Sequence, residues 1–592
     1  MSIRLNPWPI PIASVLGMGL LLSFGWSILN AQRPVRLSAL QTRTSMASRS
    51  NSNGLQPVVL FPVKQDVSPP LRSMRPVPPR SRLDEDRVRS IEILPKALNT
   101  VLPQTPDAVV QRRTVLPATP PPQMTFEGLT NVDNFETIGF RVLPPDMNGD
   151  IGPSHYVQMV NLVTAVYDRN GTRIFGPVPN NIFWQGFGGP CEFDNDGDPI
   201  VLYDSLADRW LVSQFTFEGG PPFFECVAIS TSGDPTGAYF RYAFEWPGGK
   251  FPDYPKFGVW PDAYYMSVNQ FAVTAGGFSF AGAGVAALER DRMLKGDPGA
   301  RMVVFDLSTV DIRFGGMLPA DLDGTNLPPR GMPGFFAEVD DETWIPPIDA
   351  LRLWTFRVDW RDPSRSTFGQ DGWPDFILPT APWEPIPCFR VLNCILQQAP
   401  QVPLDALGDR LMYRLQYRRQ GSRQSLVTNH TVWVDGKRTG VRWYHVVLSE
   451  SRDRECGGTP PCIWRQATQA PDDGLSRWMG SAALDGADHL CVGYSTSSAF
   501  TFPDIRYACW SGGGTTYDGE QVLFLGGGSQ THDSGRWGDY SMLTVDPRDD
   551  CTFWYTQEYY RVTNEACPET SSRACWHTRV GTFRYPDCGR SR

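Results

Sequence analysis

Short apolar segments alternate with polar turns from about Phe126 to Cys588, and this spacing predicts β-strands throughout that region. Three segments share one pattern, in which an apolar strand ends in Asp and a tight turn leads to a second apolar strand. They are Leu202–Asp204 with Arg209–Ser213, Ala483–Asp485 with Leu490–Tyr494, and Thr544–Asp546 with Cys551–Tyr555. Each pair predicts a β-hairpin. Hairpins occur in any β protein, but three of one type favour a repeated unit.

A carboxylate-rich loop of the form D-x-[ND]-G-[DT] also recurs, at Asp146–Asp150, Asp194–Asp198 and Asp321–Thr325. The first two loops run within a few residues into strand-like segments. Loops of one kind ahead of short strands are typical of a radial array of similar β-sheets. We therefore expect these turns to gather at one end of the array, and function to lie there.

The chain divides into candidate units of such an array. They begin near Gly149, Gly197, Tyr254, Gly324, Gly408, Arg477 and Arg536. These units predict an all-β fold, a seven-bladed β-propeller, with six or eight blades as alternatives because the stretch from Trp360 to Pro403 is irregular. A pair of β-sandwich domains would also give short strands with Gly and Pro turns. The propeller is favoured because similar segments recur without a linker-like break.

The composition agrees with a large β domain and excludes one class of partner. The 592 residues include 12% aromatic residues, 55 Gly and 54 Pro, which suits short strands joined by turns. The formal net charge is −9, with acidic and basic residues interspersed. This balance gives no basis for nucleic-acid binding.

The N-terminal part of the chain differs from the rest. An apolar run, Pro11–Leu29, has a length between that of a signal peptide and that of a membrane span. Residues 1–31 are therefore expected to be a signal peptide or membrane anchor, which predicts a secreted or surface-anchored, extracytoplasmic protein. Residues 32–125 are rich in Pro, Arg and Ser, and predict a largely disordered tether with a short helix around Arg87–Ile93. The propeller would occupy residues 126–592.

The cysteines favour disulfide bonds. All 12 lie between Cys191 and Cys588, and the close pairs are Cys388/Cys394, Cys456/Cys462, Cys491/Cys509 and Cys567/Cys575. An even number of cysteines in an exported chain is typical of disulfides. A zinc site is the alternative, but the chain contains no C-x-x-C spacing. The connectivity does not follow from the sequence.

Calcium is the cofactor that the acidic loops predict. Oxygen ligands on alternate residues around a Gly can surround Ca²⁺. The candidate ligands are Asp194, Asp196 and Asp198, then Asp146, Asn148 and Asp150, and least of all Asp321 and Asp323. The alternative is an Asp/Asn/Gly turn without an ion, in which each side chain bonds its own backbone.

A second group of candidate residues pairs Arg with a neighbouring aromatic residue. The motifs are Arg442-Trp443-Tyr444, Arg477-Trp478-Met479-Gly480, Arg506-Tyr507 and Arg536-Trp537-Gly538-Asp539-Tyr540. Arg can hold a carboxylate with two hydrogen bonds, and an aromatic ring can stack on a sugar. The alternative is structural, with Trp packed between blades and Arg paired with a nearby acid. His430 is a candidate general base, although a His on a strand is more often structural.

The Arg, Tyr and Asp set, together with Asp472–Trp478 and Asp533–Trp537, resembles the sialidase-like propeller superfamily. The two segments are one residue longer and one residue shorter than the Asp-box pattern S-x-D-x-G-x-x-W. In that superfamily an Arg cluster binds the substrate carboxylate, a Tyr is the nucleophile and an Asp is the acid/base. The resemblance implies these roles for Arg477, Arg536, Tyr540 and Asp539. Adjacent residues on a strand point to opposite faces, so the last two side chains are expected to diverge.

The chain is more similar to secreted bacterial β-propeller proteins of unassigned function. The segments that carry this likeness are Asn148–Pro153, Arg477–Gly480 and Arg536–Tyr540. It implies an extracytoplasmic propeller and no particular reaction.

These observations support three hypotheses for function. The first is binding of an extracellular ligand, a carbohydrate or a surface protein, at the mouth of the propeller channel. The second is a glycosidase or polysaccharide lyase acting on acidic glycans, in which Arg477 and Arg536 hold a carboxylate and Tyr540 or His430 moves a proton. The third is a structural surface module.

Overall fold

The computed structural model describes residues 54–76, 86–88, 94–95, 107–217, 220–275, 277–385, 393–398, 402–449, 459–563 and 573–589. The apolar run Pro11–Leu29 lies outside these ranges. Residues 51–592 form one compact unit.

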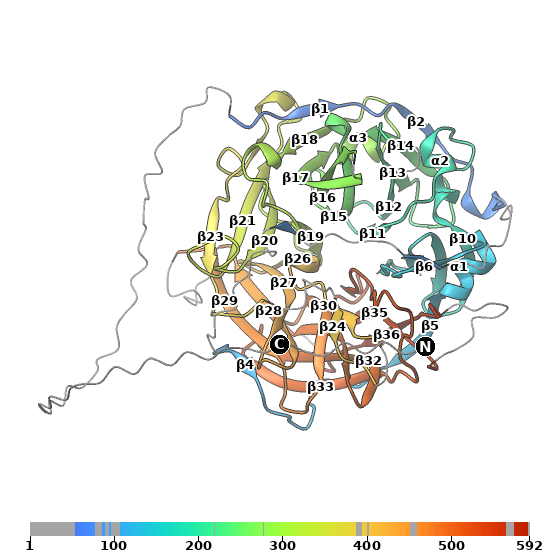
Figure 1. The fold of residues 1–592 in the computed structure, drawn as a ribbon. Helices are drawn as coiled ribbons and strands as arrows, with labels where there is room; N and C mark the ends of the chain where they lie inside the picture. Colours follow the sequence, from blue (N-terminus) through green and yellow to red (C-terminus); the bar gives the residue numbers. More distant parts are fainter. Residues whose placement is uncertain are drawn as a thin grey trace, which may run out of the picture. The chain divides into compact units, whose positions relative to one another are not determined.

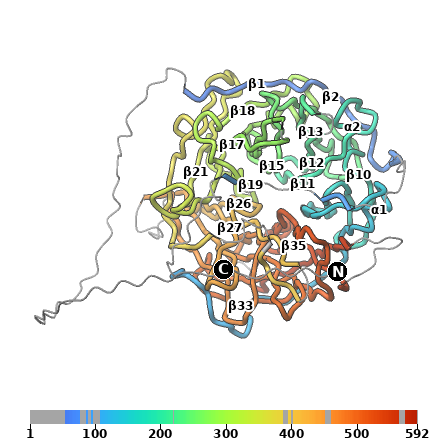
Figure 2. Tube along the Cα trace, viewed as in Figure 1, coloured from blue at the N-terminus to red at the C-terminus, as the bar shows by residue number. Residues whose placement is uncertain are grey.

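Seven groups of antiparallel strands among the described residues follow one another along the chain as the blades of a β-propeller (Figures 1 and 2). Blade 1 consists of β7 (Asn148–Ile151), β8 (His155–Val160), β9 (Val163–Asp168) and β10 (Arg173–Pro179), and blade 2 of β11 (Ile200–Asp204), β12 (Arg209–Thr216), β13 (Phe224–Ser230) and β14 (Tyr239–Glu245). Blade 3 consists of β15 (Phe251–Val259), β16 (Tyr264–Thr274), β17 (Gly277–Leu288) and β18 (Met302–Asp306). Blade 4 consists of β19 (Leu318–Asp323), β20 (Gly334–Asp340) and β21 (Ala350–Arg357), with β22 (Thr367–Phe368) and β23 (Phe376–Pro379) both paired to β21.

The C-terminal half supplies the other three blades. Blade 5 consists of β26 (Met412–Gln420), β27 (Arg423–Trp433), β28 (Thr439–Val447) and β29 (Cys462–Gln469). Blade 6 consists of β30 (Ser476–Leu484), β31 (Leu490–Ser498), β32 (Thr501–Ser511) and β33 (Thr516–Phe524). Blade 7 consists of β34 (Met542–Val545), β35 (Phe553–Tyr559) and β36 (His577–Phe583), and is completed by β5 (Met124–Thr130) from the start of the domain.

Short elements connect the blades. The helices are α1 (Asn131–Ile138), α2 (Pro190–Phe193), α3 (Arg290–Met293) and the 3₁₀ turns η1 (Leu71–Ser73), η3 (Asn180–Trp184), η4 (Pro247–Gly249), η5 (Leu307–Thr309) and η6 (Pro363–Arg365). β24 (Asn393–Ile395) and β25 (Leu404–Asp405) form a small ribbon. Among the described residues, no helix is long and apolar enough to cross a membrane.

The first strands of the blades line the axis. Each contacts the first strand of the next blade, and the series β7, β11, β15, β19, β26, β30 and β34 closes on β7 again. β19 and β26 also pair in parallel register, which joins blades 4 and 5 into one sheet. The predicted seven-bladed propeller is therefore confirmed. Six predicted unit starts fall near the beginning of an inner strand, whereas Gly324 follows the end of β19.

The three predicted hairpins join the first and second strands of blades 2, 6 and 7. The Asp that ends each inner strand has a common structural role. The carboxylates of Asp204, Asp485 and Asp546 accept hydrogen bonds from backbone N–H groups of the following turn, at 3.0, 2.9 and 3.0 Å. A carboxylate that satisfies turn amides fixes the point at which the strand reverses.

Large aromatic side chains fill the space between blades. Tyr156 of blade 1 stacks on Trp554 of blade 7, with ring centroids 5.3 Å apart. Trp478 of blade 6 contacts Trp537, which precedes blade 7, at 5.8 Å. Both Trp478 and Trp537 are fully buried. This packing explains the high aromatic content, because each interface between twisted sheets needs bulky apolar contacts.

The prediction of a disordered tether is wrong for residues 54–76 and 107–123. In these stretches β1 (Val58–Leu60) pairs with β18, β2 (Lys64–Val67) with β14, and β4 (Val110–Gln111) with β29. β3 (Asp86–Val88) is a strand paired with β6 (Arg141–Leu143), so the first two residues of the helix expected around Arg87–Ile93 lie in a strand; residues 89–93 lie outside the described residues. The outer strand of a blade offers unpaired N–H and C=O groups, which an extended segment can satisfy without any apolar periodicity. The sequence pattern therefore carried no signal.

Disulfide bonds are confirmed. They join Cys191 to Cys226, Cys491 to Cys509 and Cys551 to Cys588. Cys394, Cys462 and Cys575 are also disulfide-bonded; Cys388, Cys456 and Cys567, with which they were grouped in sequence, lie outside the described residues. Disulfides are consistent with an extracytoplasmic location.

Candidate functional site

The side chains of the first acidic loop connect neighbouring blades. Asp146 accepts hydrogen bonds from the backbone N–H of Asp539 at 2.9 Å and from the amide of Asn161 at 2.7 Å. Asn148 and Asp150 accept from backbone N–H groups of β11, at 2.6 and 2.7 Å. The loop therefore joins blade 1 to blade 2 and to the turn before blade 7.

The other two loops make similar contacts. Asp196 accepts from the backbone N–H of Phe217 at 2.7 Å, and Asp194 is partly exposed. Asp321 accepts from the backbone N–H of Val259 at 2.9 Å and pairs with Arg414 at 2.8 Å. Among the described residues, none of these loops forms a group of three acidic, His or Cys ligand atoms within 4.8 Å of one another. Calcium binding by the loops stays a prediction.

The loops do not gather at a single end of the channel. Asp146 and Asp198 precede β7 and β11 and so lie where inner strands begin, whereas Asp150 and Asp323 lie where β7 and β19 end. Two groups of functional candidates result, one at each end of the inner strands.

The group at the beginning of the inner strands surrounds Lys256, and we call Lys256 with Asp146, Asp198, Asp253 and Asp539 the axial cluster. Lys256 is completely buried. Its ammonium lies 3.5 Å from the centroid of the Tyr254 ring and 3.9 Å from that of Tyr540, and it donates to the carbonyl of Pro255 at 2.9 Å. Two aromatic faces and a carbonyl thus replace the water that an exposed ammonium would have.

Burial and charge act in opposite directions on the axial cluster. Burial lowers the pKa of Lys256 to about 8, although the four aspartates favour its charged form. Burial raises the pKa of Asp146 and of Asp253 well above the ordinary value, and neighbouring carboxylates raise both further. Lys256 is therefore the internal counter-ion of a set of mutually repelling carboxylates.

Arg536, Asp539 and Tyr540 lie at this end of the channel. Arg536 forms ion pairs with Asp405 and Asp539, both at 2.5 Å, and Tyr540 donates its hydroxyl to the carbonyl of Pro199 at 3.1 Å. The premise that Asp539 and Tyr540 are adjacent on a strand is wrong, because strand β34 begins only at Met542; the Tyr540 ring lies beside Lys256. Their catalytic roles stay a prediction.

Arg477 belongs to a different environment. It pairs with Asp473 at 2.6 Å and with Glu520 at 2.7 Å, and is fully buried in blade 6. Burial acts to raise the pKa of Glu520, but Arg477 and Arg506 lower it to about 2. The guanidinium of Arg477, which was predicted to bind a substrate carboxylate, is thus already paired with carboxylates of the protein itself.

His430 lies in blade 5. Its Nε2 is 2.9 Å from the hydroxyl of Tyr444, and its ring meets that of Trp383 edge to face at 4.4 Å. Burial, and then the charge of Arg442, lower the pKa of His430 well below its ordinary value, so the ring is neutral. The predicted catalytic residues are therefore distributed over three places.

The second group of functional candidates lines a pocket of about 320 Å³ at the ends of the inner strands. We call this pocket the mouth pocket. Four blades contribute to it. The lining residues are Asp150, Ile151, Pro153, Tyr203, Ser205, Leu206, Leu322, Asp323, Gly324, Thr325, Val545 and Pro547. Of the predicted metal ligands it contains Asp150 and, from the least favoured loop, Asp323. Burial raises the pKa of Asp150 to about 6, although Arg414 acts to lower it.

Sequence reasoning named neither Lys256 nor most of the mouth pocket. Lys256 belongs to no recognisable motif. A signal for the pocket was present in the repeated hairpins, because Tyr203 and Val545 directly precede the Asp residues that end β11 and β34. Aligning the hairpin ends would have placed these residues at one end of the channel.

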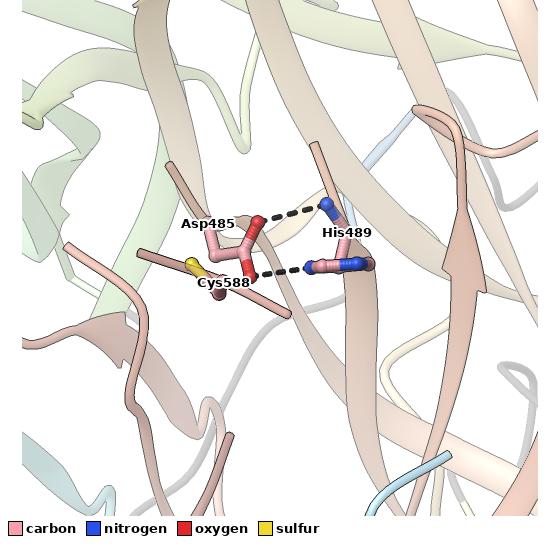
Figure 3. A group of neighbouring side chains, drawn as sticks. All are labelled: Asp485, His489 and Cys588. Carbon is pink, nitrogen blue, oxygen red and sulfur yellow. Dashed lines mark hydrogen bonds and ion pairs between the residues drawn. The ribbon is translucent and has the colours of Figure 1, made fainter. Parts of the chain in front are cut away.

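Asp485, His489 and Cys588 lie together beside the first hairpin of blade 6 (Figure 3). Nδ1 of His489 is 2.7 Å from Asp485, and the ring stacks on Tyr585 with centroids 3.8 Å apart. Cys588 has its sulfur in the disulfide with Cys551, so it offers no thiolate to a metal. These contacts hold the C-terminal segment, which contains Tyr585 and Cys588, against blade 6.

The ion pair between His489 and Asp485 is expected to weaken as the pH rises. Burial alone would lower the pKa of His489, but Asp485 raises it above the ordinary value. The protonated ring therefore contributes stability at pH 5, below its unfolded-state pKa, and this contribution is lost as the pH rises through the folded-state pKa. We expect His489→Gln to lower the free energy of unfolding by about 1 kcal/mol at pH 5 and by less at pH 8.5, measured by denaturant unfolding. An equal loss at both pH values would contradict the role of the ion pair.

Comparisons with known proteins give only distant likenesses. No protein family and no curated protein matches the chain. A protein of unknown function from Dyadobacter fermentans is 12% identical with a TM-score of 0.31, over 65% of this chain and 94% of that chain. An α-L-arabinanase mutant from Cellvibrio cellulosa is 11% identical with a TM-score of 0.26, over 64% and 94% of the two chains. A PL25 ulvan lyase is 11% identical with a TM-score of 0.25, over 76% and 81%. Because all three TM-scores lie below 0.5, these likenesses assign no function to this chain.

Proposed function

We propose that this protein binds a carbohydrate in the mouth pocket. The observation that carries the proposal is the position of the pocket, where residues at the ends of β7, β11, β19 and β34 converge from four blades. Small-molecule sites are concave, largely pre-formed and often located at the mouth of a closed β structure. The volume of about 320 Å³ lies at the lower end of the usual range for such sites.

The chemistry of the pocket supports a sugar. Carboxylates of Asp150 and Asp323 can accept hydrogen bonds from sugar hydroxyl groups, and the hydroxyls of Ser205 and Thr325 can donate or accept. Apolar side chains of the lining, such as Leu206, offer contact to the C–H faces of a ring. A few placed polar groups on apolar walls give orientation and specificity.

The contacts of the two arginines give less support to the alternative, a glycosidase or polysaccharide lyase acting on acidic glycans. That hypothesis uses Arg477 and Arg536 to hold a substrate carboxylate. Each is already paired with two carboxylates of the protein and is almost completely buried. Binding at the mouth pocket does not depend on them. A surface protein as ligand is the other outcome that a binding experiment would distinguish.

We expect Thr325→Trp to weaken glycan binding at least tenfold, because an indole at this exposed lining position would occupy the pocket. The matched control is Leu327→Trp, which introduces the same side chain on the same loop at an exposed residue outside the lining. The measurement is a screen of purified protein against a panel of oligosaccharides, followed by calorimetric titration of the best one. Binding of no glycan, or equal binding by wild type and Thr325→Trp, would refute the proposal.

A further inference from the structure

The charged groups that line the mouth pocket have one sign. Asp150 and Asp323 are its charged lining residues, and the lining contains no Lys, Arg or His. Ser205, Thr325 and Tyr203 add neutral oxygens. A ligand that enters the pocket therefore meets negative charge first.

The nearby arginines are already paired with carboxylates of the protein, one of which is Asp323 of the lining. Arg414 pairs with both Asp321 and Asp323, and Arg418 pairs with Asp550. A ligand carboxylate or sulfate would have to displace one of these internal acids, leaving that acid buried and without its partner. Removing one partner of a buried ion pair is costly, so the site disfavours an anionic ligand.

Asp150 differs from Asp323 in its partners. Its two oxygens accept hydrogen bonds from the backbone N–H groups of Ile151, at 2.8 Å, and Tyr203, at 2.7 Å. Backbone amides orient the carboxylate and leave lone pairs for a further donor. Burial next to the apolar side chains of Ile151 and Leu322 makes the ionised form of Asp150 costly.

A cation in the pocket would relieve this cost. Asp150 is almost completely buried, so a charge–charge contact there is screened less than on the surface. A neutral sugar can bond the carboxylate but brings no opposite charge. An ammonium group supplies both three donors and the missing charge.

We infer that the carbohydrate bound in the mouth pocket is an amino sugar with a free ammonium group, which lies against Asp150. This inference rests on the proposed function, because it names the class of carbohydrate that the same pocket takes. It also predicts that a glycan that loses its positive charge by N-acetylation binds more weakly than the same glycan with free amino groups.

The test compares four oligosaccharides of equal length, built from glucosamine, N-acetylglucosamine, glucose and glucuronic acid, by calorimetric titration of the full chain. The glucosamine oligomer is expected to bind at least tenfold more tightly than each of the other three. Two variants at the exposed position Thr325 change the charge of the pocket without touching its internal ion pairs. Thr325→Asp should strengthen binding of the glucosamine oligomer several-fold, and Thr325→Lys should weaken it several-fold.

The outcomes separate the inference from the proposed function. If the glucose, N-acetylglucosamine or glucuronic acid oligomer bound more tightly than the glucosamine oligomer, and Thr325→Trp still weakened that binding, the amino-sugar inference would be overturned. The proposed carbohydrate binding would stand. Binding of a neutral oligomer that appears with Ca²⁺ and disappears with EDTA would also overturn the amino-sugar inference, because a metal ion would then supply the positive charge. Failure of all four oligomers, together with failure of the wider panel, would overturn both.

Discussion

Replacing Lys256 by Met is expected to lower the free energy of unfolding by about 3–5 kcal/mol at pH 6.5, where Lys256, with a pKa of about 8, is charged; this is the cost of removing one partner from a buried ionic group. Met keeps most of the side-chain volume, so the loss reports on charge rather than on packing. Without the ammonium, Asp146, Asp198 and Asp253 would lose a positive charge that opposes their mutual repulsion, whereas Asp539 would keep its ion pair with Arg536. The measurement is guanidinium unfolding followed by tryptophan fluorescence and near-UV circular dichroism.

The control for this experiment is Lys437→Met, which makes the same change at an exposed turn of blade 5. It should alter stability by less than about 0.5 kcal/mol. The loss in Lys256→Met should also shrink as the pH falls, because burial raises the pKa of Asp146 and of Asp253 well above the ordinary value and both lose their charge at a higher pH than an exposed carboxylate. A Lys256→Met protein as stable as wild type at pH 6.5 would mean that Lys256 does not balance the axial cluster.

The second large effect concerns Glu225, a fully buried residue of β13. Burial raises the pKa of Glu225 to about 8, and Asp198 raises it further while Ser213 and Lys256 act to lower it. A pKa that is higher in the folded state means that the protonated form stabilises the fold below the unfolded-state value, and that this stability is lost as the pH rises to about 8. We expect Glu225→Gln, which cannot ionise, to raise the free energy of unfolding by roughly 3–5 kcal/mol at pH 8.5 and to change it little at pH 4.5.

Unfolding of wild type and Glu225→Gln across this pH range would measure the effect. Glu245→Gln provides the matched control, because Glu245 is exposed and lies on the adjacent strand β14 of the same blade. Its stability should follow that of wild type at every pH. If Glu225→Gln also followed wild type, the Glu225 carboxyl would have to ionise in the fold near its ordinary pKa.

The architecture could be predicted because it depends on local pattern. Alternation of apolar and polar residues determines which face of a strand is buried, and the Asp at the end of a strand satisfies the amides of its own turn. Asp204, Asp485 and Asp546 all act in this way, so three hairpins could be placed from sequence. Repetition of these local units then implied the number of blades.

The sites were predictable only in part, because they depend on contacts between distant segments. Asp146 and Asp198 were identified as candidate calcium ligands in two separate loops, and in the structure the charges of both act on Lys256. The choice of Lys256 as their counter-ion depends on the angle between blades, which no local pattern encodes. The two arginines illustrate the same limit. Arg536 pairs with Asp405 and Arg477 with Glu520, and each partner is distant in the sequence.

The strand that completes blade 7 has a consequence for biosynthesis. β5 comes before the first blade, yet its partner β36 comes after every other strand of the ring, with Thr130 opposite His577. As the chain leaves the ribosome, β5 keeps an unpaired edge until almost the whole polypeptide has emerged. Closure of the ring is therefore the last step available to the chain, and a truncated product that ends before residue 577 would leave both edges open to pairing with other molecules.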